Sequence, residues 1–143
     1  MTIFSKIIAG EIPCYKIAED EKFFAFLDIN PMTNGHVLVV PKIEEDYLFD
    51  LSDDTLGEMM IFAKKIAVSL KNTMDCVRVG VAVIGLEVPH AHIHLIPIKQ
   101  ESDMNFKNPK LKLSSQEMDQ IASEIQKDLK IWSLKSFGII DNG

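Results

Sequence analysis

The sequence contains little cysteine and no long apolar run, and each shortage excludes a class of protein. Its two cysteines, Cys14 and Cys76, stand alone in unrelated contexts, so we expect neither a disulfide framework nor a thiol metal site. No segment approaches the roughly 20 apolar residues that span a bilayer. The first ten residues are interrupted by Lys6 and lack the apolar core of a secretion signal. We therefore predict a cytoplasmic protein without a membrane partner.

Positive charge is also scarce. The formal net charge is -6 and the pI is about 5.1, whereas binding to a nucleic-acid backbone needs a basic patch or stripe. Nucleic acid is therefore not an expected partner, although local groups could still hold a small phosphorylated ligand. The 143 residues, 47% of them hydrophobic, predict one domain over residues 1–143 with a substantial core.

The spacing of apolar residues predicts five strands and three helices. Helical spacing near the start, with Gly10 as a stop, indicates a short helix. A longer helix follows the N-cap candidate Ser52, and a capping box of Ser114 and Glu117 begins the last one. We predict a loop over residues 99–109 and strands over residues 15–18, 23–27, 36–40, 77–83 and 88–98.

The C-terminal tail, residues 131–143, is more apolar than an unattached terminus should be. Trp132, Phe137 and Ile140 are examples. We predict that this tail docks on the body of the domain or on a second subunit.

Three of the four histidines lie at alternate positions, in His90-Ala91-His92-Ile93-His94. Within a strand, such spacing would place all three imidazoles on one face. They could be polar residues on an exposed face, or ligands of a metal ion completed by a distant side chain. A third interpretation is nucleophilic catalysis, in which one imidazole attacks phosphorus while neighbouring groups fix its tautomer and bind the developing charge.

Four segments together resemble the histidine triad family, in its nucleotide-binding and purine nucleoside phosphoramidase branch. The run from Val88 to Ile96 resembles the family signature, His-x-His-x-His followed by apolar residues. The segments 3–13, 25–31 and 35–42 are similar to that branch in order and spacing. The resemblance implies an α+β fold with a five-stranded antiparallel sheet and two main helices, assembled as a homodimer.

The resemblance also implies a reaction and a set of site residues. The reaction is hydrolysis or transfer of a nucleotidyl group from a phosphoramidate or dinucleotide-type purine nucleotide, without cofactor. His92 matches the nucleophile, His90 the residue whose backbone orients it, His94 a phosphate-side donor and His36 a supporting fourth histidine. Asp28 falls at the ribose position. The other implied nucleotide-binding residues are Ile3, Phe4, Ile7, Phe26 and Ile29 around the base, and Gly85, Glu87 and Val88 before the histidine run.

The sequence departs from this pattern in two places. Leu86 and Val79 stand where many members carry a phosphate-contacting Gln and an Asn, and neither apolar side chain can donate a hydrogen bond. The alternative function is therefore a nucleotide-binding dimer with little or no catalysis. Some relatives also hold a structural zinc through two cysteines and a histidine. Here Thr2, Ser5 and Glu44 occupy or adjoin those positions, so we predict that no metal is bound there.

Overall fold

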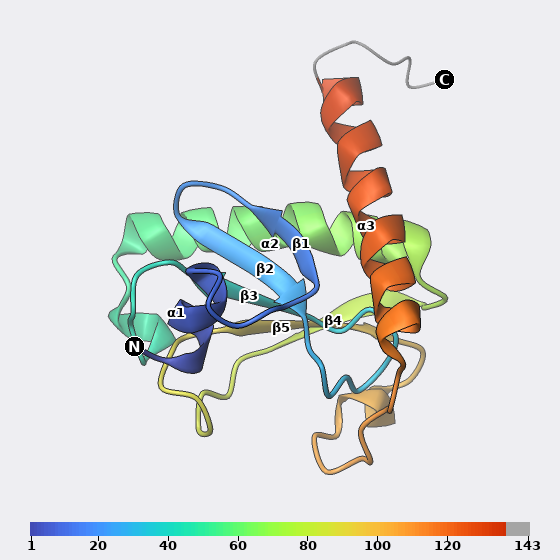
Figure 1. The fold of residues 1–143 in the computed structure, drawn as a ribbon, viewed down its shortest axis with the longest axis horizontal. Coiled ribbons are helices and arrows are strands. Elements are labelled where there is room, and N and C mark those ends of the chain that lie inside the picture. The colour runs from blue at the N-terminus through green and yellow to red at the C-terminus, as the bar shows by residue number, and fades with distance from the viewer. Residues whose placement is uncertain (137–143) are drawn as a thin grey trace.

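A computed structural model of the chain describes residues 1–136, with side chains described as far as Ile131. Its five strands form one antiparallel sheet in the order β1-β2-β3-β5-β4 (Figure 1). This confirms the predicted α+β fold. The strands are β1 (Lys16–Glu19), β2 (Phe23–Leu27), β3 (Val37–Pro41), β4 (Arg78–Ala82) and β5 (Ile93–Ile98), and the helices are α1 (Ile3–Ile8), α2 (Asp53–Thr73) and α3 (Ser115–Ser136).

The two faces of the sheet are covered differently. Helices α2 and α3 cover one face, while α1 packs against the other near β2 and β3 (Figure 1). Because both faces of β2 and β3 are covered, every residue of these two strands is buried. In β5, Ile93 and Leu95 belong to the core beneath the helices, whereas His94 between them points to the opposite face.

Local sequence explains where the two long helices begin. Ser52 caps α2 by accepting a hydrogen bond from the backbone N–H of Thr55 at 3.1 Å. At α3, Ser114 Oγ accepts from the Glu117 N–H, and Glu117 Oε1 accepts from the Ser114 N–H, both at 3.1 Å. The predicted capping box is therefore present. No helix within residues 1–136 combines the length and apolar character needed to cross a bilayer.

The prediction differs from the structure in three larger respects, besides shifts of one residue at the ends of β1, β3 and β4. The strand predicted over 88–98 begins only at Ile93, because residues 86–90 bend and the His90 N–H bonds back to the Val88 carbonyl in a tight turn. Of the three alternating histidines, only His94 is therefore in the strand. The predicted loop 99–109 contains a 3-10 helix, Glu101–Met104. Helix α3 continues to Ser136, so the first part of the predicted tail is helical, while residues 137–143 lie outside the described residues.

Candidate functional site

The histidines open onto a cavity of about 400 Å³ on the α1 side of the sheet. His36 and His94 come from the beginnings of the β3 and β5 regions, and His92 from the segment just before β5. The cavity wall is completed by α1, the loop between β4 and β5, and the segment that precedes α3. Its other lining residues are Phe4, Asp28, Asn30, Leu38, Ile84, Gly85, Leu86, Glu87, Val88, Phe106 and Lys110.

His92 is held in one ring orientation. Its Nδ1 lies 2.7 Å from the carbonyl oxygen of His90, and because a carbonyl only accepts, Nδ1 carries the proton and donates it. In a neutral ring, Nε2 then keeps its lone pair. Among the described residues, the only buried side-chain N or O atom without a hydrogen bond is Ser69 Oγ, so His92 Nε2 is accessible from the cavity. This is the arrangement that an imidazole nucleophile requires.

His90 is fully buried and uses both ring nitrogens inside the protein. Nε2 donates to the carbonyl oxygen of Pro41 at 2.8 Å, and Nδ1 lies 2.7 Å from the hydroxyl of Thr2. The ring does not line the cavity. His90 therefore reaches the cavity only indirectly, through its carbonyl oxygen, which holds His92.

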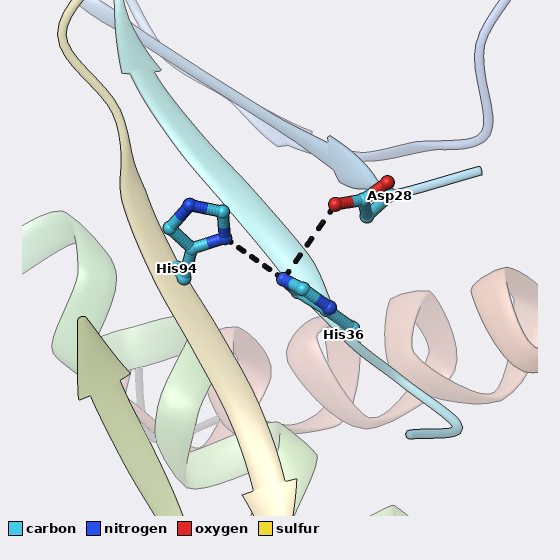
Figure 2. A group of neighbouring side chains, drawn as sticks. All are labelled: Asp28, His36 and His94. Atoms are coloured by element: carbon cyan, nitrogen blue, oxygen red, sulfur yellow. Dashed lines mark hydrogen bonds and ion pairs between the residues drawn. The ribbon is translucent and has the colours of Figure 1, made fainter. Parts of the chain in front are cut away.

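His36, His94 and Asp28 form a second group of neighbouring side chains, as Figure 2 shows. His36 Nδ1 accepts a hydrogen bond from the Met32 backbone N–H at 3.0 Å, so in the neutral ring the proton lies on Nε2. Nε2 of His36 lies 2.9 Å from His94 Nδ1 and 3.7 Å from Asp28 Oδ2 (Figure 2). His94 Nδ1 therefore accepts, and the proton of a neutral His94 is on Nε2.

These hydrogen bonds give His94 a specific chemical property. Nε2 of His94 has no hydrogen-bond partner among the described residues and is not completely buried, because it would otherwise be counted with Ser69 Oγ. The ring thus offers an N–H donor from the cavity wall. Such a donor suits a phosphoryl oxygen, as the sequence predicted for His94.

The same three residues are close enough to hold a metal ion, with their ligand atoms within 4.8 Å of one another. However, a metal ligand must offer a lone pair, and the Met32 N–H directs the proton of His36 onto the nitrogen that faces the other two residues. Binding a metal would leave two N–H groups of His36 and Met32 facing each other. The donor set therefore favours a hydrogen-bonded chain over a metal centre.

Burial changes the proton affinity of this group. It lowers the pKa of His36 to about 3, with the charge on His94 as the next cause, and lowers the pKa of His94 to about 4, with His92 as the next cause. Both rings are therefore neutral near pH 7. Burial also raises the pKa of Asp28, although the Asn30 N–H donates to its carboxylate and opposes the shift.

The predicted nucleotide-binding residues fall into two groups. Phe4, Asp28, Gly85, Glu87 and Val88 all line the cavity. The other four do not: Phe26 and Ile7 pack in the apolar cluster beneath Phe4, while Ile3 and Ile29 are exposed on the surface.

Five lining residues were not predicted as site residues: Asn30, Leu38, Ile84, Phe106 and Lys110. The Phe106 ring packs edge-on against His94, with 5.0 Å between ring centroids. The Lys110 ammonium donates to the carbonyl oxygens of Phe106 and Asn108, which folds the loop over the cavity. For Phe106 and Lys110, the only sequence signal was a lone aromatic residue in a polar segment without periodicity.

The two departures from the expected motif lie in different places. Leu86 is 88% exposed at the rim of the cavity, where a longer polar side chain could reach inward. Val79 is in β4 and packs against the core beneath the helices, not against the cavity. Only the change at Leu86 therefore removes a donor from the cavity lining.

Comparison with known proteins gives consistent matches. A model of the HIT domain matches residues 9–101. An uncharacterized HIT-like protein of Borreliella burgdorferi is 35% identical over 135 residues, which cover 89% of this chain and 97% of that protein. The adenosine 5'-monophosphoramidase hnt1 of Schizosaccharomyces pombe is 32% identical over 130 residues, 90% of this chain and 98% of its own. The crystal structure of a Hit-like protein from Bartonella henselae covers 89% of this chain and 95% of its own, with 28% identity and a TM-score of 0.76.

Proposed function

The chain belongs to the histidine triad family, and from that premise we propose that it hydrolyses or transfers the nucleotidyl group of a purine nucleoside phosphoramidate or dinucleotide-type substrate. The observation that carries the proposal is the orientation of His92. Its Nδ1–H donates to the His90 carbonyl, and its Nε2 is left unpartnered at the cavity. The similarity to a protein named as an adenosine 5'-monophosphoramidase supports a phosphoramidate as the first substrate to test.

The proposed reaction has two steps. In the first, the Nε2 lone pair of His92 attacks the α-phosphorus, forming a P–N bond while the bond to the leaving amine or phosphate breaks and the leaving group takes a proton from solvent. In the second, water attacks the same phosphorus and gives a proton back to solvent, the P–N bond to His92 breaks and returns the electron pair to Nε2, and a nucleoside monophosphate is released. The His94 Nε2–H stabilises charge on the phosphoryl oxygens in both steps.

The remaining cavity groups fit the nucleoside part of such a substrate. Asp28 offers carboxylate oxygens that can accept hydrogen bonds from ribose hydroxyls. Phe4 offers an apolar ring for the base, and Glu87 and Val88, which also line the cavity, are the residues whose backbone N–H groups we propose as donors to the phosphate. We retain Ile3, Ile7, Phe26 and Ile29 in the proposal only as residues that shape or flank the base pocket.

The experiment that tests the proposal uses the intact chain and its His92→Ala variant. Each is incubated with a purine nucleoside phosphoramidate, and both product and an intact-mass adduct are measured after a quench that avoids acid. We expect product and a nucleotidyl adduct with the wild type and neither with His92→Ala. His92→Gln is a matched control, because it keeps a polar side chain but no imidazole.

A second candidate function is nucleotide binding with little catalysis, and the exposed Leu86 side chain favours it. Calorimetric titration with a nucleoside monophosphate separates the two. Binding by a wild-type protein that gives neither product nor adduct would reject the hydrolase and support the binder.

We include a homodimer in the proposal because β4 forms an edge of the sheet. It pairs only with β5, and exposed apolar side chains lie along and beside it, among them Val77 and Val81, which are 60% and 51% exposed. A second copy could cover this edge. Light scattering should give twice the mass of one chain, and Val81→Lys should shift it toward the monomer. The cytoplasm remains the proposed location, to be tested by cell fractionation.

A further inference from the structure

Four polar residues from distant parts of the sequence form a hydrogen-bonded cluster at the start of α1. They are Thr2, Ser5, Glu44 and His90, and none of them lines the cavity. Glu44 Oε1 accepts hydrogen bonds from the Thr2 backbone N–H and the Ser5 hydroxyl, both at 2.6 Å. The carboxylate thereby fixes the first turn of α1 to the segment that follows β3.

The proton positions in this cluster follow from its donors and acceptors. Ser5 gives its hydroxyl proton to Glu44, and Thr2 Oγ1 accepts the Ser5 backbone N–H at 3.0 Å as the N-cap of α1. Because His90 Nε2 must donate to the Pro41 carbonyl, Nδ1 of a neutral His90 has only a lone pair. Thr2 Oγ1 also lies 3.2 Å from Ser5 Oγ, but His90 Nδ1 is closer, at 2.7 Å, and can only accept, so the Thr2 hydroxyl proton points to His90 Nδ1.

The cluster is connected to the nucleophile by two short paths. The His90 carbonyl accepts the Nδ1–H of His92, so the placement of His90 fixes the ring of His92. Phe4, also on α1, packs edge-on against both rings, with centroid distances of 5.7 Å to His90 and 5.1 Å to His92. In addition, the backbone carbonyl oxygen of Glu45 accepts a hydrogen bond from the Ala91 N–H at 2.6 Å, which holds the backbone between the two histidines.

We propose that Thr2, Ser5 and Glu44 form a positioning relay, in which the Thr2 hydroxyl donates to His90 Nδ1 and holds the ring, as the Nε2–H tautomer, against the Pro41 carbonyl, and the His90 carbonyl then orients His92 for attack. Thr2 is the central residue because it alone joins α1, Glu44 and the His90 ring. The kinetic consequence of the relay rests on the proposed function, whereas the tautomers do not. The hydrogen-bonding side chains of Thr2, Ser5 and Glu44 thus lie at or beside the positions that the family resemblance assigns to zinc ligands in some relatives.

The test compares three substitutions of Thr2. Thr2→Val removes the hydroxyl at constant shape. Thr2→Asp can still cap α1 but cannot donate to His90 Nδ1, so it separates the relay from the cap. Thr2→Ser keeps both functions and serves as the rescue. Long-range ¹H–¹⁵N spectra report the tautomers of His90 and His92, and rapid-quench mass spectrometry reports the rate of nucleotidyl-adduct formation.

We expect Thr2→Val to remove the hydrogen bond at His90 Nδ1, which shifts the ¹⁵N resonance of that nitrogen while the Pro41 carbonyl keeps the proton on Nε2. We expect Thr2→Asp to accept a hydrogen bond from a protonated Nδ1 instead. Both variants should slow adduct formation about tenfold, a modest cost for a misplaced nucleophile. Nucleotide affinity should not change, because Thr2 does not line the cavity. Thr2→Ser should behave as the wild type.

A wild-type His90 Nδ1 resonance in both Thr2→Val and Thr2→Asp would overturn the relay. So would a changed His90 spectrum accompanied by the wild-type rate and an undisturbed His92. If the wild type forms no adduct at all, the proposed function fails, but the His90 and His92 spectra of the variants still decide whether the relay exists.

Discussion

The two flanks of His92 are built differently. On the α1 flank, His90 is completely buried and both of its ring nitrogens have protein partners, Thr2 and Pro41. The other flank is the loop before the histidine run, which exposes apolar side chains, with Ile84 48% and Leu86 88% exposed. The chain therefore orients its nucleophile with its own hydrogen bonds but supplies no side-chain donor from this loop to a bound phosphate. Orientation and charge stabilisation are separate requirements of catalysis, and this chain meets the first more fully.

The largest expected effect comes from Leu86→Gln, which would add an amide donor on the poorly equipped flank. Removing one transition-state donor from an enzyme costs on the order of a hundredfold in rate, so adding one here should raise kcat by about tenfold or more. Steady-state hydrolysis of a purine nucleoside phosphoramidate measures the change.

Leu86→Glu is the matched control, because it has nearly the same shape as Gln but carries a negative charge and no N–H donor. It should lower the rate by repelling the phosphate. Equal rates for wild type and Leu86→Gln would contradict the view that the two flanks differ in what they contribute.

Most of the fold can be predicted from the sequence, because apolar residues recur at regular spacing along the helices and strands. The stripe of α2 and the alternation in the strands depend on burial against a large core, which composition and spacing reveal. The turn at Asn34-Gly35 is equally predictable from the sequence, because Gly35 has a φ of +86° that other residues rarely adopt.

The cavity was harder to predict because its contacts depend on single side chains. His90, His92 and His94 have the period of a strand, but the first two lie outside β5, where backbone carbonyls hold their rings. The spacing of residues along the sequence cannot show these hydrogen bonds between ring nitrogens and backbone carbonyls. Phe106 and Lys110 were missed because a loop without periodicity is placed by a few long-range contacts.

A second prediction concerns acid, and it tests the His36–His94 pair. Both rings are held neutral, with pKa values of about 3 and about 4, whereas an unfolded histidine titrates near 6.5. Below about pH 6.5 the unfolded chain therefore binds more protons than the folded one, so stability is present at neutral pH and is lost as the pH falls toward 4. When the pH falls from about 7 to about 5, each ring should lower the free energy of unfolding by about 2 kcal/mol.

Urea unfolding across this pH range measures the loss. His36→Gln should remove about half of the slope. The raised pKa of Asp28 acts in the opposite sense, because protonation favours its folded form, so Asp28→Asn should steepen the slope. A slope that does not change in His36→Gln would show that this pair is not the source of the acid sensitivity.

The smallest expected effect is that of Lys110→Met. This variant tests whether the loop that carries Phe106 and Lys110 supports His94 on the cavity wall. The Lys110 ammonium binds the carbonyl oxygens of Phe106 and Asn108, and Phe106 in turn packs on His94. Methionine keeps the apolar stem but loses these charge-assisted hydrogen bonds, so nucleotide affinity should fall about threefold to tenfold. Lys107→Met is the matched control, because Lys107 is exposed in the same loop and lies outside the cavity lining. Calorimetric titration of both variants distinguishes a local effect of Lys110 from a general loss of positive charge. An equal loss of affinity in the two variants would mean that the loop attracts the phosphate only by its net charge. A loss confined to Lys110→Met would mean that Phe106 and His94 must be held together for the nucleotide to bind.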